Sequence, residues 1–167
     1  MTARPTPHGK LVPVQEGSEL QLQRTFALPA ETVWAAVTES DRLEQWIGRW
    51  EGDTSTGQVS FFMTAESPDA EASPVTIHEC ARPHRLSIDT GAGEMLWHLR
   101  LEIADVEGGT VLTFVHLLGA NDQVENVGPG WEYYLDRLVA VLTGGDVATI
   151  SWDNYYPAMS AYYDSLA

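Results

Sequence analysis

Apolar and polar residues alternate along several stretches of this chain, and this alternation predicts strands. In the clearest stretch, Trp97, Leu99, Leu101 and Ile103 all fall on one face, together with Met95. Glycine-containing turns separate neighbouring stretches, as is typical of antiparallel hairpins. The predicted strands cover residues 19–26, 57–63, 75–80, 86–89, 94–103 and 110–118.

Helical spacing replaces this alternation in three places. Pro29 suits the first turn of a short helix that carries Val33, Trp34 and Val37, and a second short helix is predicted from Ser40 to Trp46. A longer helix is predicted to begin at Trp131, after a Gly-Pro-Gly sequence, and to end at Gly144. Its apolar stripe consists of Trp131, Tyr134, Leu135, Leu138, Val141 and Leu142.

These elements predict one α+β domain with short segments on either side. The proline-containing residues 1–17 are predicted to be an N-terminal tail that drapes over the domain. Residues 18–145 form the predicted domain, and residues 146–167 are predicted to be a C-terminal extension that packs on it. The length of 167 residues suits a single core.

Several short segments carry a family resemblance through their order and spacing. The chain resembles the START-like superfamily, also called SRPBCC or helix-grip, and within it the AHSA1-like branch, similar to the C-terminal domain of the Hsp90 ATPase activator. The matching residues are Ala30 to Trp34 with Thr38, Leu43, Trp46, Pro83, Arg85, Leu86, Gly109 to Phe114, Gly130, Trp131 and Leu135 to Leu138.

The resemblance implies a curved antiparallel sheet wrapped around the long C-terminal helix, with two short helices after the first strand. Relatives in the superfamily include lipid carriers, plant hormone receptors and polyketide aromatases or cyclases, so the fold alone does not select an activity. The eukaryotic co-chaperone has a further N-terminal domain that makes much of the Hsp90 contact. Because this chain has no room for that domain, we do not expect an Hsp90 interaction.

Charge and composition exclude several classes of partner. Nine basic and 24 acidic residues give a net charge of −15, which disfavours nucleic acids and anionic membrane surfaces. No apolar run is long enough for a membrane helix, and the first ten residues contain no secretory apolar segment. With a single cysteine, Cys80, the sequence is compatible with a cytoplasmic location.

The main functional expectation is a ligand cavity between the long helix and the sheet, lined mostly by aromatic and other apolar side chains. Large aromatic side chains line pockets well, although they also fill cores, and both alternatives stay open. No metal site or bound cofactor is expected. The candidate ligand-binding residues are Trp46, Phe61, Met63, Ile77, Glu79, Trp97, Leu99, Phe114, His116, Trp131, Tyr134 and Leu138.

Two residues of this set have titratable side chains and are candidates for a catalytic or polar binding role. His116 shares a strand face with Leu112 and Phe114, so it is the candidate acid or base, or else a histidine bonded to a nearby loop. Glu79 is predicted to point inward and to pair with Arg24, either as a structural ion pair or as a polar ligand anchor.

Three functions remain open at this stage. The first is binding of a small hydrophobic or aromatic molecule, and the second is a cyclase- or dehydratase-like reaction that uses a pocket histidine or carboxylate. The third is a co-chaperone-like or regulatory interaction through an exposed outer patch that contains Leu96, Val111 and Val115. A homodimer that covers this patch is a further alternative.

Overall fold

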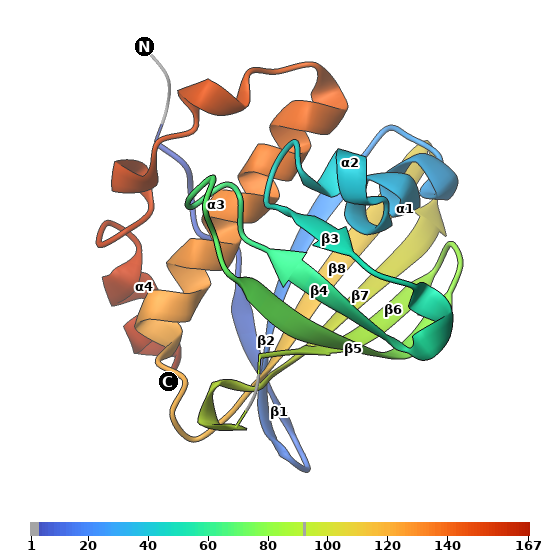
Figure 1. Ribbon diagram of the computed structural model, residues 1–167. Coiled ribbons are helices and arrows are strands. Elements are labelled where there is room, and N and C mark those ends of the chain that lie inside the picture. The colour runs from blue at the N-terminus through green and yellow to red at the C-terminus, as the bar shows by residue number, and fades with distance from the viewer. Residues whose placement is uncertain (1–3, 92) are drawn as a thin grey trace.

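The computed structural model describes residues 4–91 and 93–167, and it confirms the α+β helix-grip architecture. A curved antiparallel sheet has the strand order β1-β2-β8-β7-β6-β5-β4-β3 (Figure 1). Neighbouring strands in this sheet are also consecutive in the sequence, with the single exception of β2 and β8. The strands are β1 (Lys10–Val14), β2 (Gly17–Phe26), β3 (Arg49–Glu51), β4 (Gln58–Phe62), β5 (Ala72–Ala81), β6 (Arg85–Thr90), β7 (Trp97–Val106) and β8 (Gly109–Leu118).

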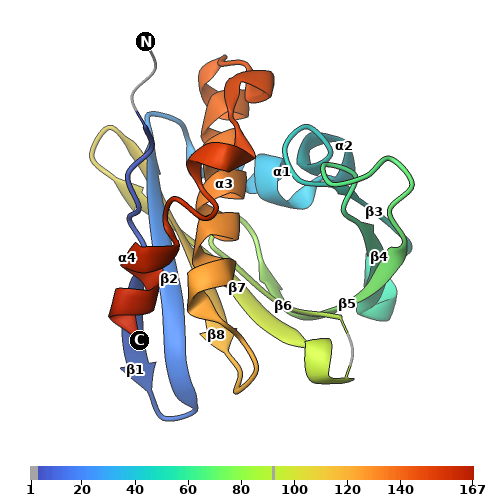
Figure 2. The same ribbon diagram turned by 90° about the vertical axis from the view of Figure 1, so that its left-hand side faces the viewer.

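Helices cover only part of the concave inner face of this sheet. The long helix α3 (Val124–Thr143) lies against it beside β2 and β8, and α1 (Ala30–Thr38) and α2 (Ser40–Leu43) cover one end. The short helix α4 (Ser160–Leu166) packs on α3 from the side away from β5 and β6 (Figure 2).

The sheet begins earlier in the chain than the sequence predicts. Residues 10–14, expected to belong to the tail, form the edge strand β1, which pairs with β2 from Lys10↔Gln21 to Val14↔Gly17. Pro13 lies in this strand, and an edge position suits it because proline cannot donate a ladder hydrogen bond. The expected tail is therefore shorter by this strand.

Helix α3 also begins earlier than expected, at Val124 rather than Trp131. The helix runs through Gly128, Pro129 and Gly130, a sequence that normally indicates a break. Packing explains the first glycine, because a Cβ atom at Gly128 would lie 2.4 Å from Cδ1 of the Tyr163 ring in α4. Gly128 therefore allows the close contact between α3 and α4.

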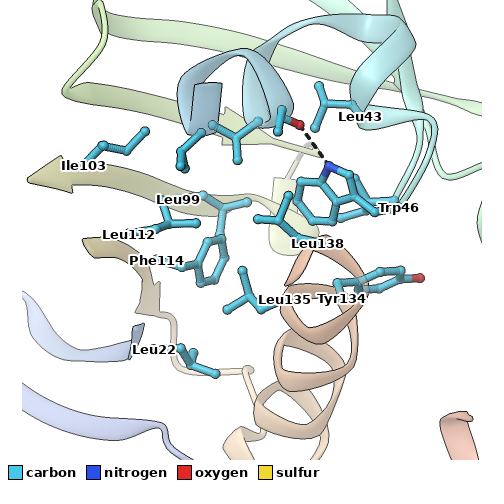
Figure 3. Close-up of a cluster of buried hydrophobic side chains, with 14 of the residues drawn as sticks. Leu22, Leu43, Trp46, Leu99, Ile103, Leu112, Phe114, Tyr134, Leu135 and Leu138 are labelled. Carbon is cyan, nitrogen blue, oxygen red and sulfur yellow. Dashed lines mark hydrogen bonds between the residues drawn. The ribbon is translucent and has the colours of Figure 1, made fainter. Parts of the chain in front are cut away.

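The apolar core lies between α1, α3 and strands β2, β7 and β8. Leu20, Leu22 and Phe26 point from β2 into this core, and Leu138 of α3 is completely buried against it. Figure 3 shows Leu135 and Leu138 facing the sheet residues Leu99, Leu112 and Phe114. This packing fixes α3 on β2, β7 and β8 and leaves β5 and β6 without helical cover.

A buried carboxylate, Glu132 of α3, connects both ends of the chain to the domain. One oxygen, Oε1, accepts hydrogen bonds from the amides of His8 (2.6 Å) and Gly9 (3.0 Å) and from the Tyr163 hydroxyl. The other, Oε2, accepts from Nη2 of Arg24 at 2.7 Å. Arg24 also pairs with Asp136 at 3.1 Å. The carboxylate is thus paired and hydrogen-bonded, as a buried charge requires.

The predicted pair between Arg24 and Glu79 is therefore wrong, and a β-bulge explains why. The pairing of β5 with β6 shifts between Ile77↔Ile88 and Glu79↔Ser87, so His78 is an extra residue. This turns Glu79 to the outer face, where it pairs with Arg85 and its side chain is 48% exposed. Simple alternation would have placed it on the inner face with Ile77.

Candidate functional site

Along two rows of paired residues on the inner face, burial decreases in steps from β2 toward β5. One row of directly paired residues crosses five strands and has the order Leu20, His116, Leu99, Ile88 and Ile77. Leu20 and His116 are 0% exposed and Leu99 is 9% exposed, whereas Ile88 and Ile77 are only partly buried. The apolar surface at Ile77 and Ile88 is therefore partly open to solvent, whereas Val75, the inward-facing neighbour of Ile77 on β5, is buried.

A second row shows the same decrease. It crosses from Leu22 through Phe114 to Leu101 and Leu86, and its last two residues are again only partly buried. We call the partly buried side chains of this region the open inner face. Its members are Ile77, Leu86, Ile88, Trp97 and Leu101 from the sheet and Trp131 from α3.

An aromatic cluster forms the border between the open inner face and the closed core. It comprises Trp97, Phe114, His116, Trp131 and Tyr134. The ring of Trp131 lies 4.3 Å from that of Phe114 and 6.0 Å from that of Trp97, measured between centroids. Such tilted and edge-on contacts are the favoured aromatic geometries, so the cluster forms a firm wall.

His116 lies at the centre of this cluster and is completely buried. The indole N–H of Trp131 donates to its Nδ1 at 3.1 Å, and the Trp97 ring lies 4.7 Å away. Its Nε2 atom has no hydrogen-bond partner among residues 4–91 and 93–167, although Oδ2 of Asp122 is 3.5 Å away. That separation is longer than a well-formed hydrogen bond.

Burial lowers the pKa of His116 to about 4, although the nearby Asp122 carboxylate acts in the opposite direction. The imidazole is therefore neutral at pH 7. Asp122 is itself fixed, because it accepts hydrogen bonds from the Trp97 indole at 3.0 Å and from the Gly119 amide at 2.7 Å. The loop before α3 thus holds Trp97 in place.

A second polar contact joins α3 to the loop between β4 and β5. The Tyr134 hydroxyl donates to Oε1 of Glu66 at 2.9 Å. The ring of Tyr134 is buried, whereas Glu66 is exposed. Burial, followed by the Glu66 carboxylate, raises the pKa of Tyr134, so the hydroxyl stays protonated and remains a donor.

The structure divides the predicted ligand residues into three groups. Glu79 is on the outer face and does not belong to the site. The partly buried residues are Phe61, Met63, Ile77, Trp97 and Trp131. The remaining residues pack in the core and are Trp46, Leu99, Phe114, His116, Tyr134 and Leu138.

Sequence reasoning missed several residues of this region. Leu86 and Ile88 alternate within β6, so the pattern that found the strand also identifies them as inward-facing. Glu66 and Asp122 lie in loops, where no periodicity indicates direction. Only the fold brings these two carboxylates to Tyr134 and Trp97.

Neither the surface depressions nor the arrangement of metal-binding side chains indicates another site in the described residues. Two open depressions, of about 340 and 230 Å³, lie near the β2–α1 connection and on α1, and neither touches the open inner face. In the part of the chain that the structure describes, no group of three His, Cys, Asp or Glu side chains suits a metal ion. Within the same residues, no helix has the length and apolarity needed to cross a bilayer.

The outer face differs from the predicted apolar patch. Val115 is only 1% exposed, because the ion pair between Arg100 of β7 and Glu19 of β2 (2.9 Å) bridges over β8. Leu96 is 38% exposed but lies in the connection before β7. The three residues therefore do not form one continuous exposed surface.

Comparison with solved structures shows the same fold in several bacterial proteins. CalU16 from Micromonospora echinospora matches with 21% identity and a TM-score of 0.70, covering 96% of each chain. The protein encoded by BPP1335 from Bordetella parapertussis matches with 22% identity and a TM-score of 0.74, covering 99% of this chain and 93% of that one. EF2215 from Enterococcus faecalis, a conserved protein of unknown function, matches with 17% identity and a TM-score of 0.69, covering 95% and 92%.

At these levels of sequence identity the matches show a shared fold and give no information about activity. No curated protein matches the chain. Residues 27–143, from the residue that follows β2 to the end of α3, match the family described as Activator of Hsp90 ATPase homolog 1-like protein. Since the match spans most of the chain and the observed fold agrees with it, this protein belongs to the Activator of Hsp90 ATPase homolog 1-like family.

Proposed function

We propose that this protein binds a small hydrophobic or aromatic molecule on the open inner face, between α3 and strands β5 to β7. The observation that supports this is the stepwise loss of burial along the row from Leu20 to Ile77. Apolar side chains that point toward the concave side of a sheet, yet remain partly exposed, are a natural surface for an apolar ligand.

The energetics favour a ligand that covers several of these side chains together. Covering about 150 Å² of apolar protein surface yields roughly 4 kcal/mol at 25 cal/mol per Å². Part of this gain offsets the loss of ligand freedom on binding. Preformed walls reduce that loss, and the contacts of Trp131 with Phe114 and His116 fix one wall in advance.

An acid–base reaction, the second hypothesis, would rest on His116. A neutral imidazole with an unpartnered Nε2 atom favours this chemistry. However, the ring is completely buried, so a substrate would reach it only after Trp97 or Trp131 moved. We therefore rank ligand binding first. In this function His116 positions the Trp131 side chain by accepting its indole hydrogen bond.

Titration with N-phenyl-1-naphthylamine, an uncharged fluorescent aromatic probe, tests the proposed site. Ile77→Trp places a large side chain on the open inner face, while Thr76→Trp makes the same change on the outer face of β5. We expect Ile77→Trp to weaken probe binding at least about tenfold and Thr76→Trp to leave it unchanged. Circular dichroism verifies that both variants remain folded.

Absence of probe binding to the unmodified protein would contradict the proposal. Equal binding by the two variants would contradict it as well, because the probe would then occupy another surface.

A further inference from the structure

Resting on the proposed function, we infer the chemical class of the ligand from the groups that border the open inner face. The ligand is an uncharged or positively charged aromatic molecule, and it presents a hydrogen-bond donor to Tyr134 and Glu66. Anionic ligands such as carboxylates and sulfonates are excluded from this site. Four observations on the groups around the site support this inference.

The basic side chains are occupied elsewhere. Six arginines pair with carboxylates, and Arg137 donates through Nε to the carbonyl of Trp46 at 2.8 Å. Of the nine basic residues, the other two are Arg4, which precedes β1, and Lys10, the first residue of β1. Strand β1 is separated from β5 by β2, β8, β7 and β6. The paired arginines are Arg24, Arg42, Arg49, Arg82, Arg85 and Arg100.

The indole donors near the site are also occupied. Trp46 donates to the carbonyl of Ala36 at 2.9 Å, visible as the dashed line in Figure 3. Trp97 donates to Asp122 and Trp131 donates to His116. Tryptophans usually offer an N–H to a polar ligand group, but these three offer only their ring faces and edges.

Acceptors, in contrast, remain available at the border of the site. Glu66 uses one oxygen to accept from Tyr134, and a carboxylate has room for further hydrogen bonds on both oxygens. The Tyr134 hydroxyl, already a donor to Glu66, can itself accept from a ligand. An amine, ammonium or hydroxyl group on the ligand would match this pair.

Carboxylates flank the aromatic cluster from two sides. Glu66 lies at Tyr134 and Asp122 lies at Trp97, while Tyr134 and Trp97 both contact Trp131. Arg137 of α3 is the basic group that acts on Tyr134, and its Nε donates to the carbonyl of Trp46. The two carboxylates outnumber this single cation, and the net charge of −15 also favours a negative potential at the site. An anion placed between these two groups would be repelled from both.

Two probes with the same aromatic skeleton test this inference. N-phenyl-1-naphthylamine is uncharged, whereas 8-anilino-1-naphthalenesulfonate adds one sulfonate to it. We expect the sulfonate to bind at least about tenfold more weakly, and to displace the uncharged probe correspondingly poorly. Glu66→Gln should reduce the difference in affinity between the two probes. Glu71→Gln is the control, because it removes the same charge from an exposed residue that makes no hydrogen bond to the site, and it should leave this difference in affinity unchanged.

The outcomes separate this inference from the proposed function. If neither probe binds, the proposed function fails. If both bind equally well at the face blocked by Ile77→Trp, the function stands and the charge selectivity is wrong. If Glu71→Gln narrows the difference as much as Glu66→Gln, net charge explains the effect, and the role of Glu66 is wrong.

Discussion

The indole N–H of Trp131 donates a hydrogen bond to Nδ1 of His116, and this contact decides which nitrogen of the neutral histidine carries the proton. Because Nδ1 is the acceptor, the proton of the neutral ring lies on Nε2, on the side of Asp122. The tryptophan wall and the protonation state of the histidine are therefore linked, and a change in one affects the other.

Stability should increase with pH between about 4 and 6.5 because of His116. Its pKa is about 4 in the folded protein, below the ordinary value of 6.5, so over this range the unfolded chain binds more protons. A single such group contributes a slope of at most about 1.4 kcal/mol per pH unit. Urea unfolding from pH 5 to 7 measures this slope.

His116→Gln should reduce that slope, because glutamine can still accept from Trp131 but does not titrate. His84→Gln, at an exposed turn histidine, serves as the control and should retain the slope. Identical slopes in the unmodified protein and His116→Gln would show that His116 does not cause the pH dependence.

Two glycines in α3 should respond in opposite ways to alanine. At Gly128 the new Cβ would clash with the Tyr163 ring at 2.4 Å, and we expect a loss of about 2–3 kcal/mol. At Gly130 no atom lies within 4 Å of the new Cβ, so the better helix propensity of alanine should stabilise by about 0.5–1 kcal/mol. Chemical denaturation of the two variants measures both effects, and a stabilising Gly128→Ala would contradict the observed packing of α4.

Replacing Glu132 by glutamine should release the N-terminal segment. The substitution leaves Arg24 with one carboxylate partner and weakens the bonds from the amides of His8 and Gly9. We expect a loss of about 2–4 kcal/mol, together with faster amide hydrogen exchange at residues 8–14. Glu79→Gln removes an exposed carboxylate instead and should cost less than about 1 kcal/mol. Similar costs at the two positions would contradict the buried role of Glu132.

Asp122→Ala should free the Trp97 indole while leaving that of Trp46 unchanged. Trp97 loses its acceptor, so its N–H should exchange faster with water, whereas Trp46 still donates to the Ala36 carbonyl. The pKa of His116 should fall further, because the Asp122 carboxylate opposes the effect of burial. Two-dimensional NMR of the indole and imidazole groups measures both changes, and an unshifted Trp97 signal would show that Asp122 does not hold this side chain.

Alternation was sufficient to predict most of the sheet, because side-chain direction in a strand depends only on position along it. Leu20, Leu22 and Phe26 all point inward as the pattern indicates. The pattern failed at Glu79, since a single extra residue, His78, reverses the direction of everything after it within the strand. Bulges have no sequence signal as clear as alternation.

The start of α3 and most of the polar contacts depend on tertiary structure. Gly128 and Pro129 indicate a helix break by local propensity, and only the ring of Tyr163 explains why a glycine is needed there. In the same way, the partner of Arg24 lies 108 residues away at Glu132, a separation that local pattern cannot bridge. The family resemblance supplied the architecture, but it contained no information about these contacts.

The carboxylate of Glu132 also has a consequence for the order of folding during synthesis. Residues 8, 9 and 24 are made long before Glu132, so three of its partners are present when α3 leaves the ribosome. The fourth, the Tyr163 hydroxyl, is added 31 residues later. A nascent chain that contains the complete sheet and α3 still has an incompletely bonded carboxylate beside Gly128, so the native fold is completed only when the segment that contains Tyr163 has emerged.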